Sequence, residues 1–209
     1  VRHDLTTAAG CSTLRAALVV SAMPIDRADQ LMALLSSQRD QSKDEVAALA
    51  LALHKTGTGE LPVSRLVLSG HSGGTSIGGD GTGVLTFEAV RALADLFPEG
   101  SARIRHLAVS GCFSGDLEQI ESFRKVFPRL DSVWAYDGFS PSAERGAPAH
   151  LRAWEAMTDG ERPAAVDAKL HNVMTWNSED GYQWRNPKPL ADIQAHATAT
   201  SGVFDEYVR

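Results

Sequence analysis

The chain has 209 residues, of which 43% are hydrophobic and 22% are charged. This composition is ordinary for a globular protein and excludes a disordered chain, a collagen-like repeat and a coiled coil. Acidic residues outnumber basic ones by 26 to 20, which gives a formal net charge of −6. An acidic chain lacks the basic surface that nucleic acid requires, and its longest apolar runs are too short to span a membrane. We therefore expect a single domain over residues 1–209, with neither nucleic acid nor membrane as partner.

The chain contains two cysteines, Cys11 and Cys112. Two cysteines do not form a disulfide framework, and no CxxC or histidine-rich spacing indicates a metal site. No cofactor is expected, and the cytoplasm is the default compartment. Cys11 has no motif around it, so we expect it to be structural.

The first quarter of the chain predicts one strand and two helices. The apolar run 14–22 has the length of a strand and is followed by Pro24. Apolar residues then recur at helical spacing from Ile25. Ser42 and Glu45 have the spacing of a capping box, which predicts the start of the next helix.

Strands and helices alternate through the remainder. Apolar runs predict strands over 65–69, 104–110, 132–136 and 170–176. Helices are predicted after the capping residues Thr86 and Asp116 and around 148–158. The glycine-rich stretch 75–83 is predicted to be a long mobile loop that borders the substrate cleft.

This alternation predicts an α/β fold with a mostly parallel sheet of about six strands and helices on both faces. The central four strands would be 14–22, 65–69, 104–110 and 132–136. In such sheets, functional sites lie at the carboxyl ends of the strands.

Two consecutive predicted strands end in the same pattern, an apolar run followed by Ser-Gly-X. X is His71 after the first of them and Cys112 after the second. Parallel neighbours lie about 4.8 Å apart, so both side chains could face one substrate carbonyl. A cysteine is a strong nucleophile near neutral pH, and a nearby histidine can activate it or protonate a leaving group. The small residues on either side, mostly glycines, would let a peptide approach closely.

The order strand–SGH–loop–helix–strand–SGC–SG, over about 14–176, resembles the caspase-like cysteine peptidases, which include caspases, metacaspases, legumain, clostripain, gingipain and separase. The resemblance implies a three-layer sandwich and a protein or peptide substrate. It also implies a catalytic dyad of Cys112 and His71 without an acidic third member. The expected oxyanion donors are the backbone N–H groups of Cys112 and of Ser72 or Gly73.

In this family, the residue before the scissile bond enters a pocket near the ends of the first strand, the cysteine strand and the strand after it. Here the strand after Cys112 ends in Asp137, and no Arg or Lys occurs between Asp131 and Ser142. Asp26 is the acid nearest the end of the first predicted strand. We therefore expect cleavage after Arg or Lys, with Asp137 as the first candidate for substrate binding and Asp26 as the second.

Two alternatives stay open at the level of the sequence. Residues 70–74, Gly-His-Ser-Gly-Gly, match the nucleophile elbow G-x-S-x-G of α/β-hydrolases. Ser72 would then be the nucleophile of a serine esterase, with Asp137 and either His171 or His196 completing a triad. The other alternative is a catalytically silent caspase-like module that only binds partners. The sequence does not decide the oligomeric state.

Overall fold

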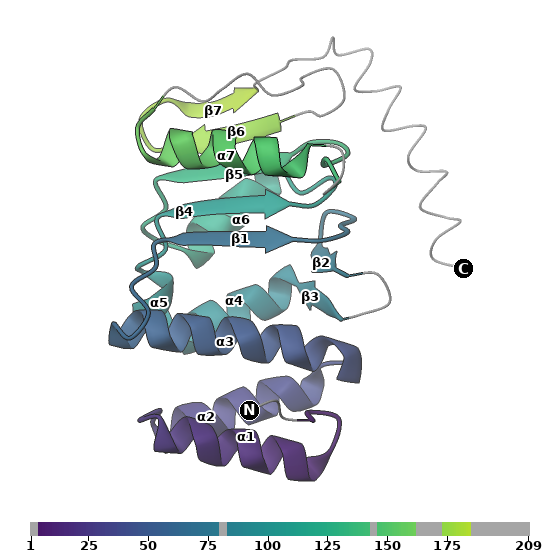
Figure 1. Cartoon of the computed structure of the whole chain (residues 1–209), viewed down its shortest axis with the longest axis vertical. Coiled ribbons are helices and arrows are strands. Elements are labelled where there is room, and N and C mark those ends of the chain that lie inside the picture. Colours follow the sequence, from purple (N-terminus) through teal and green to yellow (C-terminus); the bar gives the residue numbers. More distant parts are fainter. Residues whose placement is uncertain (1–3, 80–82, 143–145, 162–172, 185–209) are drawn as a thin grey trace, which may run out of the picture.

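The computed structural model describes residues 4–79, 83–142, 146–161 and 173–184 (Figure 1). It begins with helices α1 (Ala8–Val20), α2 (Ile25–Ser37) and α3 (Lys43–Thr58), with a single 3-10 turn, η1 (Asp40–Ser42), before α3. The predicted strand 14–22 is therefore wrong. Residues 14–20 belong to α1, whose alanines favour a helix and whose N-cap Thr7 accepts a hydrogen bond from the N–H of Gly10. A short apolar run cannot by itself separate a strand from a helix.

The helix predicted to begin after Ser42 does begin there, but without the capping box. The hydroxyl of Ser42 accepts a hydrogen bond from the backbone N–H of Val84, at 3.2 Å, and caps nothing in its own helix. Ser42 thus ties the start of α3 to a strand 42 residues later. By contrast, Thr86 and Asp116 cap their helices as predicted, each accepting from the N–H three residues on.

The main sheet has the strand order β1-β4-β5-β6-β7. Its strands are β1 (Arg65–Ser69), β4 (His106–Ser110), β5 (Ser132–Tyr136), β6 (Val173–Asn177) and β7 (Gly181–Trp184). The first three are parallel, and β6 and β7 are antiparallel to their neighbours. Within the described ranges the sheet thus has five strands rather than six. The segment 14–22 contributes no strand, whereas the edge strand β7, which was not predicted, is part of the sheet.

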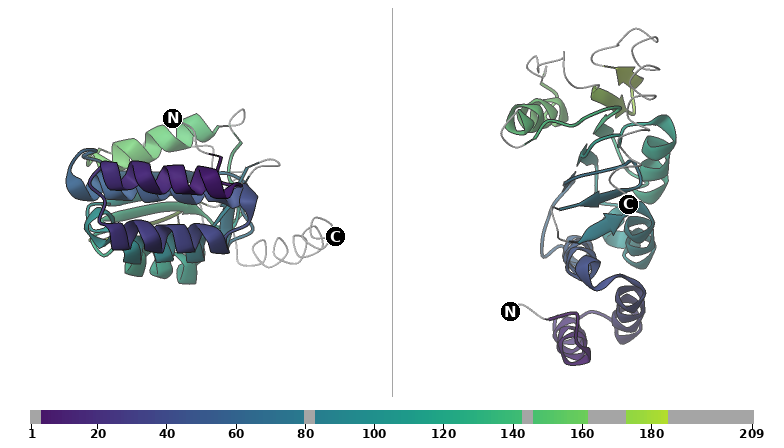
Figure 2. Two further views of the ribbon diagram at one scale, coloured as in Figure 1. Left: turned by 90° about the horizontal axis from the view of Figure 1, so that it is seen from below. Right: turned by 90° about the vertical axis from the view of Figure 1, so that its right-hand side faces the viewer.

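Helices cover both faces of this sheet (Figure 2). Helices α4 (Phe87–Leu96) and α6 (Leu117–Val126) lie on one face, and α7 (Ala147–Thr158) lies on the other. The alternation of side chains along β4 and β5 explains both layers. Leu107 and Val133 belong to the core shared with α4 and α6, whereas Ala108 and Trp134 belong to the core under α7. The short helix α5 (Pro98–Ser101) lies at the amino end of β4.

The predicted loop 75–83 is in part a hairpin. Strand β2 (Ser76–Gly78) pairs with the antiparallel strand β3 (Val84–Thr86), and Ile77 from β2 is buried. The glycines concealed this hairpin because strands are usually poor in glycine. Residues 80–82 lie outside the described residues, so the expected mobility of the loop stays a prediction.

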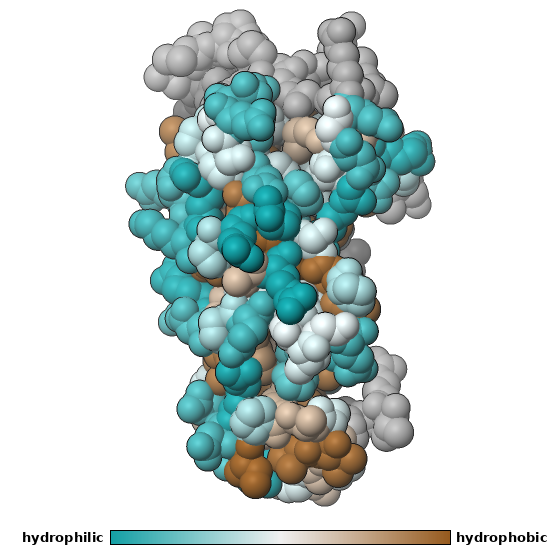
Figure 3. Space-filling model, turned by 90° about the vertical axis from the view of Figure 1, so that its left-hand side faces the viewer, coloured by the Kyte–Doolittle hydropathy of each residue, from teal (hydrophilic) through white to brown (hydrophobic). Residues whose placement is uncertain are grey.

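The amino-terminal side of the parallel strands is largely hydrophilic, with an apolar patch at the end of the molecule that carries α1 and α2 (Figure 3). Val20 at the end of α1 is 88% exposed, and Ile25 at the start of α2 is 56% exposed. In the part of the chain that the structure describes, no helix combines the length and apolar character needed to cross a membrane.

Candidate active site

The register of the sheet brings the two Ser-Gly-X strand ends together. Ser69 on β1 pairs with Ser110 on β4, and the N–H of Gly70 donates to the carbonyl of Ser110 at 3.1 Å. His71 and Cys112 therefore follow paired residues by the same two positions. Because β1 and β4 are parallel neighbours, both residues leave the sheet at its carboxyl edge, as the sequence predicts.

A backbone bridge to the hairpin holds His71 in place. Its N–H donates to the carbonyl of Gly78 at 2.7 Å, and the N–H of Gly78 donates back to the carbonyl of His71 at 2.8 Å. Its side chain is exposed. The position of His71 thus depends on β2 as well as on β1.

Cys112 lies in a tight turn between β4 and α6, and its side chain is half-buried. Phe113 adopts a φ of 55°, in the left-handed region that bulky residues rarely occupy. The buried hydroxyl of Ser114 donates to the carbonyls of Val109 at 3.1 Å and Gly111 at 2.8 Å, which fixes the turn. The turn thereby holds Cys112 at the carboxyl edge of the sheet, two residues beyond the end of β4.

The glycines beside Cys112 make room for the protein's own chain, although they were expected to admit a substrate. A Cβ atom on Gly111 would lie 2.6 Å from Ile77 Cδ1 and 2.7 Å from Ser72 Cβ. A Cβ atom on Gly115 would lie 2.8 Å from the backbone of Tyr136. The small residues thus let β2 and β5 approach the Cys112 turn.

The segment that follows β5 also reaches this turn. The N–H of Phe113 donates to the carbonyl of Gly138 at 2.8 Å, and the rings of Phe113 and Phe139 meet edge to face with centroids 5.2 Å apart. The hydroxyl of Ser140 lies 3.6 Å from the sulfur of Cys112. Sequence reasoning did not identify Phe139 or Ser140, because no motif marks them.

Backbone N–H groups are available beside Cys112. Those of Cys112, Ser72 and Gly73 donate no hydrogen bond to another residue among those described. The turn that Ser72 and Gly73 begin packs on the Cys112 turn, because a Cβ atom on Gly74 would lie 3.1 Å from the carbonyl oxygen of Phe113. This arrangement leaves donors at the edge where an oxyanion would need them.

Asp137 lies at the end of β5, next to Gly138, and is half-buried. Burial raises the pKa of its carboxyl group, and the negative charge of Asp116 raises this pKa further. A cation close to Asp137 would therefore stabilise the ionised form of its carboxyl group.

The structure does not bring Asp26 to this site. Asp26 lies in the first turn of α2, and its neighbour Arg27 forms an ion pair with Glu99 of α5 at 3.2 Å. Helix α5 marks the amino end of the parallel strands, opposite Cys112 (Figure 1). Asp26 was predicted to bind substrate because 14–22 was taken for a strand; since that segment is helical, the prediction loses its basis.

The geometry around Ser72 differs from a nucleophile elbow, in which a strand turns directly into a helix. The chain instead passes from Ser72 into β2, and the next helix begins at Phe87. The hydroxyl of Ser72 accepts a hydrogen bond from the N–H of Gly74 at 3.0 Å. His171 and His196, the two histidines considered for a serine triad, lie outside the described residues.

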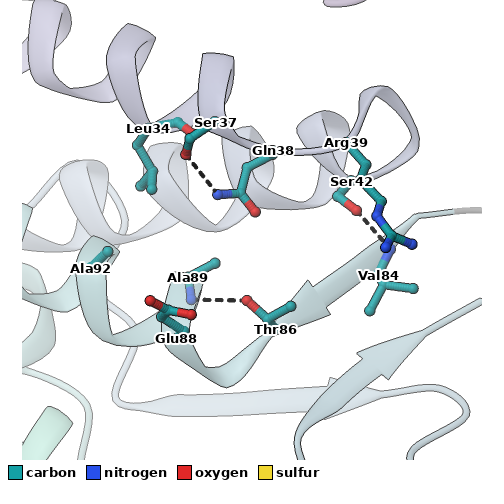
Figure 4. Close-up of a pocket in the computed structure, with 10 residues that line it drawn as sticks. All are labelled: Leu34, Ser37, Gln38, Arg39, Ser42, Val84, Thr86, Glu88, Ala89 and Ala92. Carbon is teal, nitrogen blue, oxygen red and sulfur yellow. Dashed lines mark hydrogen bonds between the residues drawn. The ribbon is translucent and has the colours of Figure 1, made fainter.

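A cavity of about 550 Å³ lies between the end of α2, the start of α3, β3 and the start of α4 (Figure 4). Neither His71 nor Cys112 lines it. Three of its polar side chains already bond within the protein, namely Ser37 to Gln38, Ser42 to Val84 and Thr86 to Ala89. Over the described ranges, no group of three or more His, Cys, Asp or Glu side chains could hold a metal ion.

Comparisons with protein-family models, with curated proteins and with solved structures find no significant match. The case for function therefore depends on the site itself.

Proposed function

We propose that the chain is a cysteine endopeptidase of the caspase-like type, with Cys112 as nucleophile and His71 as general acid and base. The observation that carries the proposal is the register of β1 and β4, which places the two residues at equivalent positions beyond neighbouring parallel strands. The arrangement of α4 and α6, the sheet, and α7 in three layers agrees with this type of fold.

In the proposed reaction, the sulfur of Cys112 attacks the carbonyl carbon of the scissile peptide bond, and the thiol proton passes to His71. The N–H groups of Cys112 and of Ser72 or Gly73 stabilise the oxyanion of the tetrahedral intermediate. His71 then protonates the leaving amine, and a thioester remains on Cys112. Water hydrolyses the thioester, giving one proton to His71, which returns it to the sulfur.

Asp137 is the proposed binding residue for a basic side chain before the scissile bond. Its position next to Gly138, whose carbonyl bonds to Phe113, puts it beside the Cys112 turn. A substrate Lys or Arg would offset the burial and the repulsion by Asp116 that disfavour the ionised carboxylate. The preference is read from a fluorogenic peptide library, in which a preference for Asp or an uncharged residue contradicts it.

The nucleophile is identified by labelling the folded protein with iodoacetamide and, separately, with a phosphonofluoridate, followed by mass spectrometry. Rapid alkylation of Cys112 that slows in a His71→Ala variant supports the peptidase. Cys11 in the same sample is the internal control, because its alkylation should not depend on His71. Labelling of Ser72 by the phosphonofluoridate supports a serine esterase, and labelling of neither residue supports a silent interaction module.

A further inference from the structure

Three contacts join the segment Gly138–Ser140 to the turn that carries Cys112. One is the backbone hydrogen bond from Phe113 to Gly138, and another is the packing of Phe113 against Phe139. The third contact, between the hydroxyl of Ser140 and the sulfur of Cys112 at 3.6 Å, reaches the proposed reacting atom itself. The first two contacts hold the segment in position for the third.

The Ser140 hydroxyl can form a hydrogen bond with the sulfur of Cys112 both before and during attack on a substrate. A thiol and a hydroxyl can each donate to the other, and both bonds are weak. A thiolate can only accept, so the Ser140 hydroxyl then donates to a charged atom, which makes a stronger hydrogen bond. The contact can therefore persist while the sulfur attacks, and it directs the sulfur.

Charged and titratable groups also lie at the ends of the elements that meet at this turn. They are His71 beyond β1, Asp137 beyond β5 and Asp116 at the start of α6. A hydroxyl can orient the sulfur without adding a further charge that would compete with a basic substrate.

We propose that Ser140 is the positioning residue of the nucleophile: its hydroxyl forms a hydrogen bond with the sulfur of Cys112 and orients the sulfur for attack. The inference rests on the proposed function, because it takes Cys112 as the nucleophile. It adds to the dyad a third polar group, which comes from the β5 side of the site.

The test measures the rate at which iodoacetamide alkylates Cys112. A Cys11→Ala background leaves Cys112 as the one thiol. In Ser140→Ala, alkylation should be about tenfold slower, since the hydrogen bond that directs the sulfur is lost. Ser142→Ala is the matched control, because Ser142 is an exposed serine two residues further along the chain and its replacement should leave the rate unchanged.

Ser140→Thr and Ser140→Val form a second pair that differs in the hydroxyl group but hardly in shape. Thr should retain the alkylation rate and Val should lose it, even if both variants melt at a lower temperature than the parent. Equal rates in Thr and Val, or a parental rate in Ser140→Ala, overturn the inference.

Failure of this inference is distinguishable from failure of the proposed function. Alkylation reports on the thiol and requires no peptide cleavage. A hydroxyl-dependent alkylation rate with no cleavage of any peptide would reject the peptidase and retain the role of Ser140. Cleavage of peptides with an unchanged alkylation rate in Ser140→Ala would do the reverse.

Discussion

Ser69 and Ser110 are paired in register on adjacent parallel strands, so His71 and Cys112 each lie two residues beyond the same point at the carboxyl edge of the sheet. A shift of one residue in the pairing of β1 with β4 would turn alternate side chains to opposite faces and separate the two strand ends. Burial of Leu107 and Val109 on one face and Ala108 on the other fixes β4 against such a shift. The packing of the sheet core thereby determines the geometry of the proposed dyad.

Substitutions in the dyad should separate the peptidase from the esterase. Cys112→Ala should abolish peptide cleavage while leaving the fold intact, because alanine fits a half-buried turn. His71→Ala should lower kcat/KM by about 10²–10⁴, the usual contribution of a general acid or base. Ser72→Ala should have a mild effect, whereas a serine esterase would lose several orders of magnitude. Parental cleavage of a fluorogenic peptide by Cys112→Ala would contradict the peptidase.

Much of the sheet could be predicted from the sequence, because strands β1, β4 and β5 are apolar runs of strand length followed by turn residues. The helices after Thr86 and Asp116 were predictable for a similar reason, since a capping residue precedes an apolar face with helical spacing. The prediction failed over 14–22, where an apolar run rich in alanine suits a helix as well as a strand. It also missed the β2–β3 hairpin, which contains or adjoins several glycines.

The candidate site was predictable where it depends on a repeated local pattern. His71 and Cys112 share the Ser-Gly-X pattern. Because the two strands are parallel neighbours, the same pattern after each strand brings the last residue of the pattern to an equivalent position at the same edge of the sheet. Ser140 and Phe139 were missed because they lie beyond β5 with no repeated pattern, and only tertiary contacts bring them to Cys112. Asp26 was misplaced as a direct consequence of the wrong strand.

Asp137→Asn should raise the free energy of unfolding at neutral pH and reduce activity toward basic substrates. Burial and the negative charge of Asp116 raise the pKa of the Asp137 carboxyl in the folded state above its ordinary value of 3.8. At pH values between the pKa of the Asp137 carboxyl in the unfolded chain and its higher pKa in the folded protein, the folded protein binds more protons than the unfolded chain. The contribution of this carboxyl to the free energy of unfolding therefore falls as the pH rises. The contribution is complete below the unfolded pKa and is lost above the folded one.

The advantage of Asp137→Asn over the parent should accordingly be present at neutral pH and vanish in acid, where Asp137 is protonated. Urea denaturation at several pH values measures this difference. Asp95→Asn is the control, because Asp95 is exposed on α4 and its replacement should leave the pH dependence unchanged. An advantage of Asp137→Asn that grows toward low pH would contradict the assignment.

Tyr136→Phe should destabilise the core under α7 by about 1–3 kcal/mol, since buried polar groups lose a partner. The indole N–H of Trp134 donates to the Tyr136 hydroxyl at 3.2 Å, and Nδ1 of His150 lies 3.1 Å from the same oxygen. Burial raises the pKa of Tyr136 to about 12, so its ionisation should contribute nothing to the pH dependence of this loss near neutral pH. Chemical denaturation provides the measurement, with the half-buried Tyr182→Phe as a milder comparison.

Alanine at the two glycines beside Cys112 should separate stability from activity. In Gly115→Ala, the new methyl group would meet the backbone of Tyr136 at 2.8 Å, and the backbone at the end of β5 cannot move away without loss of packing. This variant should lose about 1–3 kcal/mol of stability, as overpacked cores do.

In Gly111→Ala, the methyl group would meet the end of the Ile77 side chain at 2.6 Å and Ser72 Cβ at 2.7 Å. Because Ile77 can change its rotamer, this variant should lose less stability than Gly115→Ala. Displacement of the Ser72 turn should, however, move the proposed oxyanion donors, and kcat should fall with little change in KM. Thermal melting and peptide kinetics on both variants give the comparison, and full activity in Gly111→Ala would place the oxyanion donors elsewhere than in the Ser72 turn.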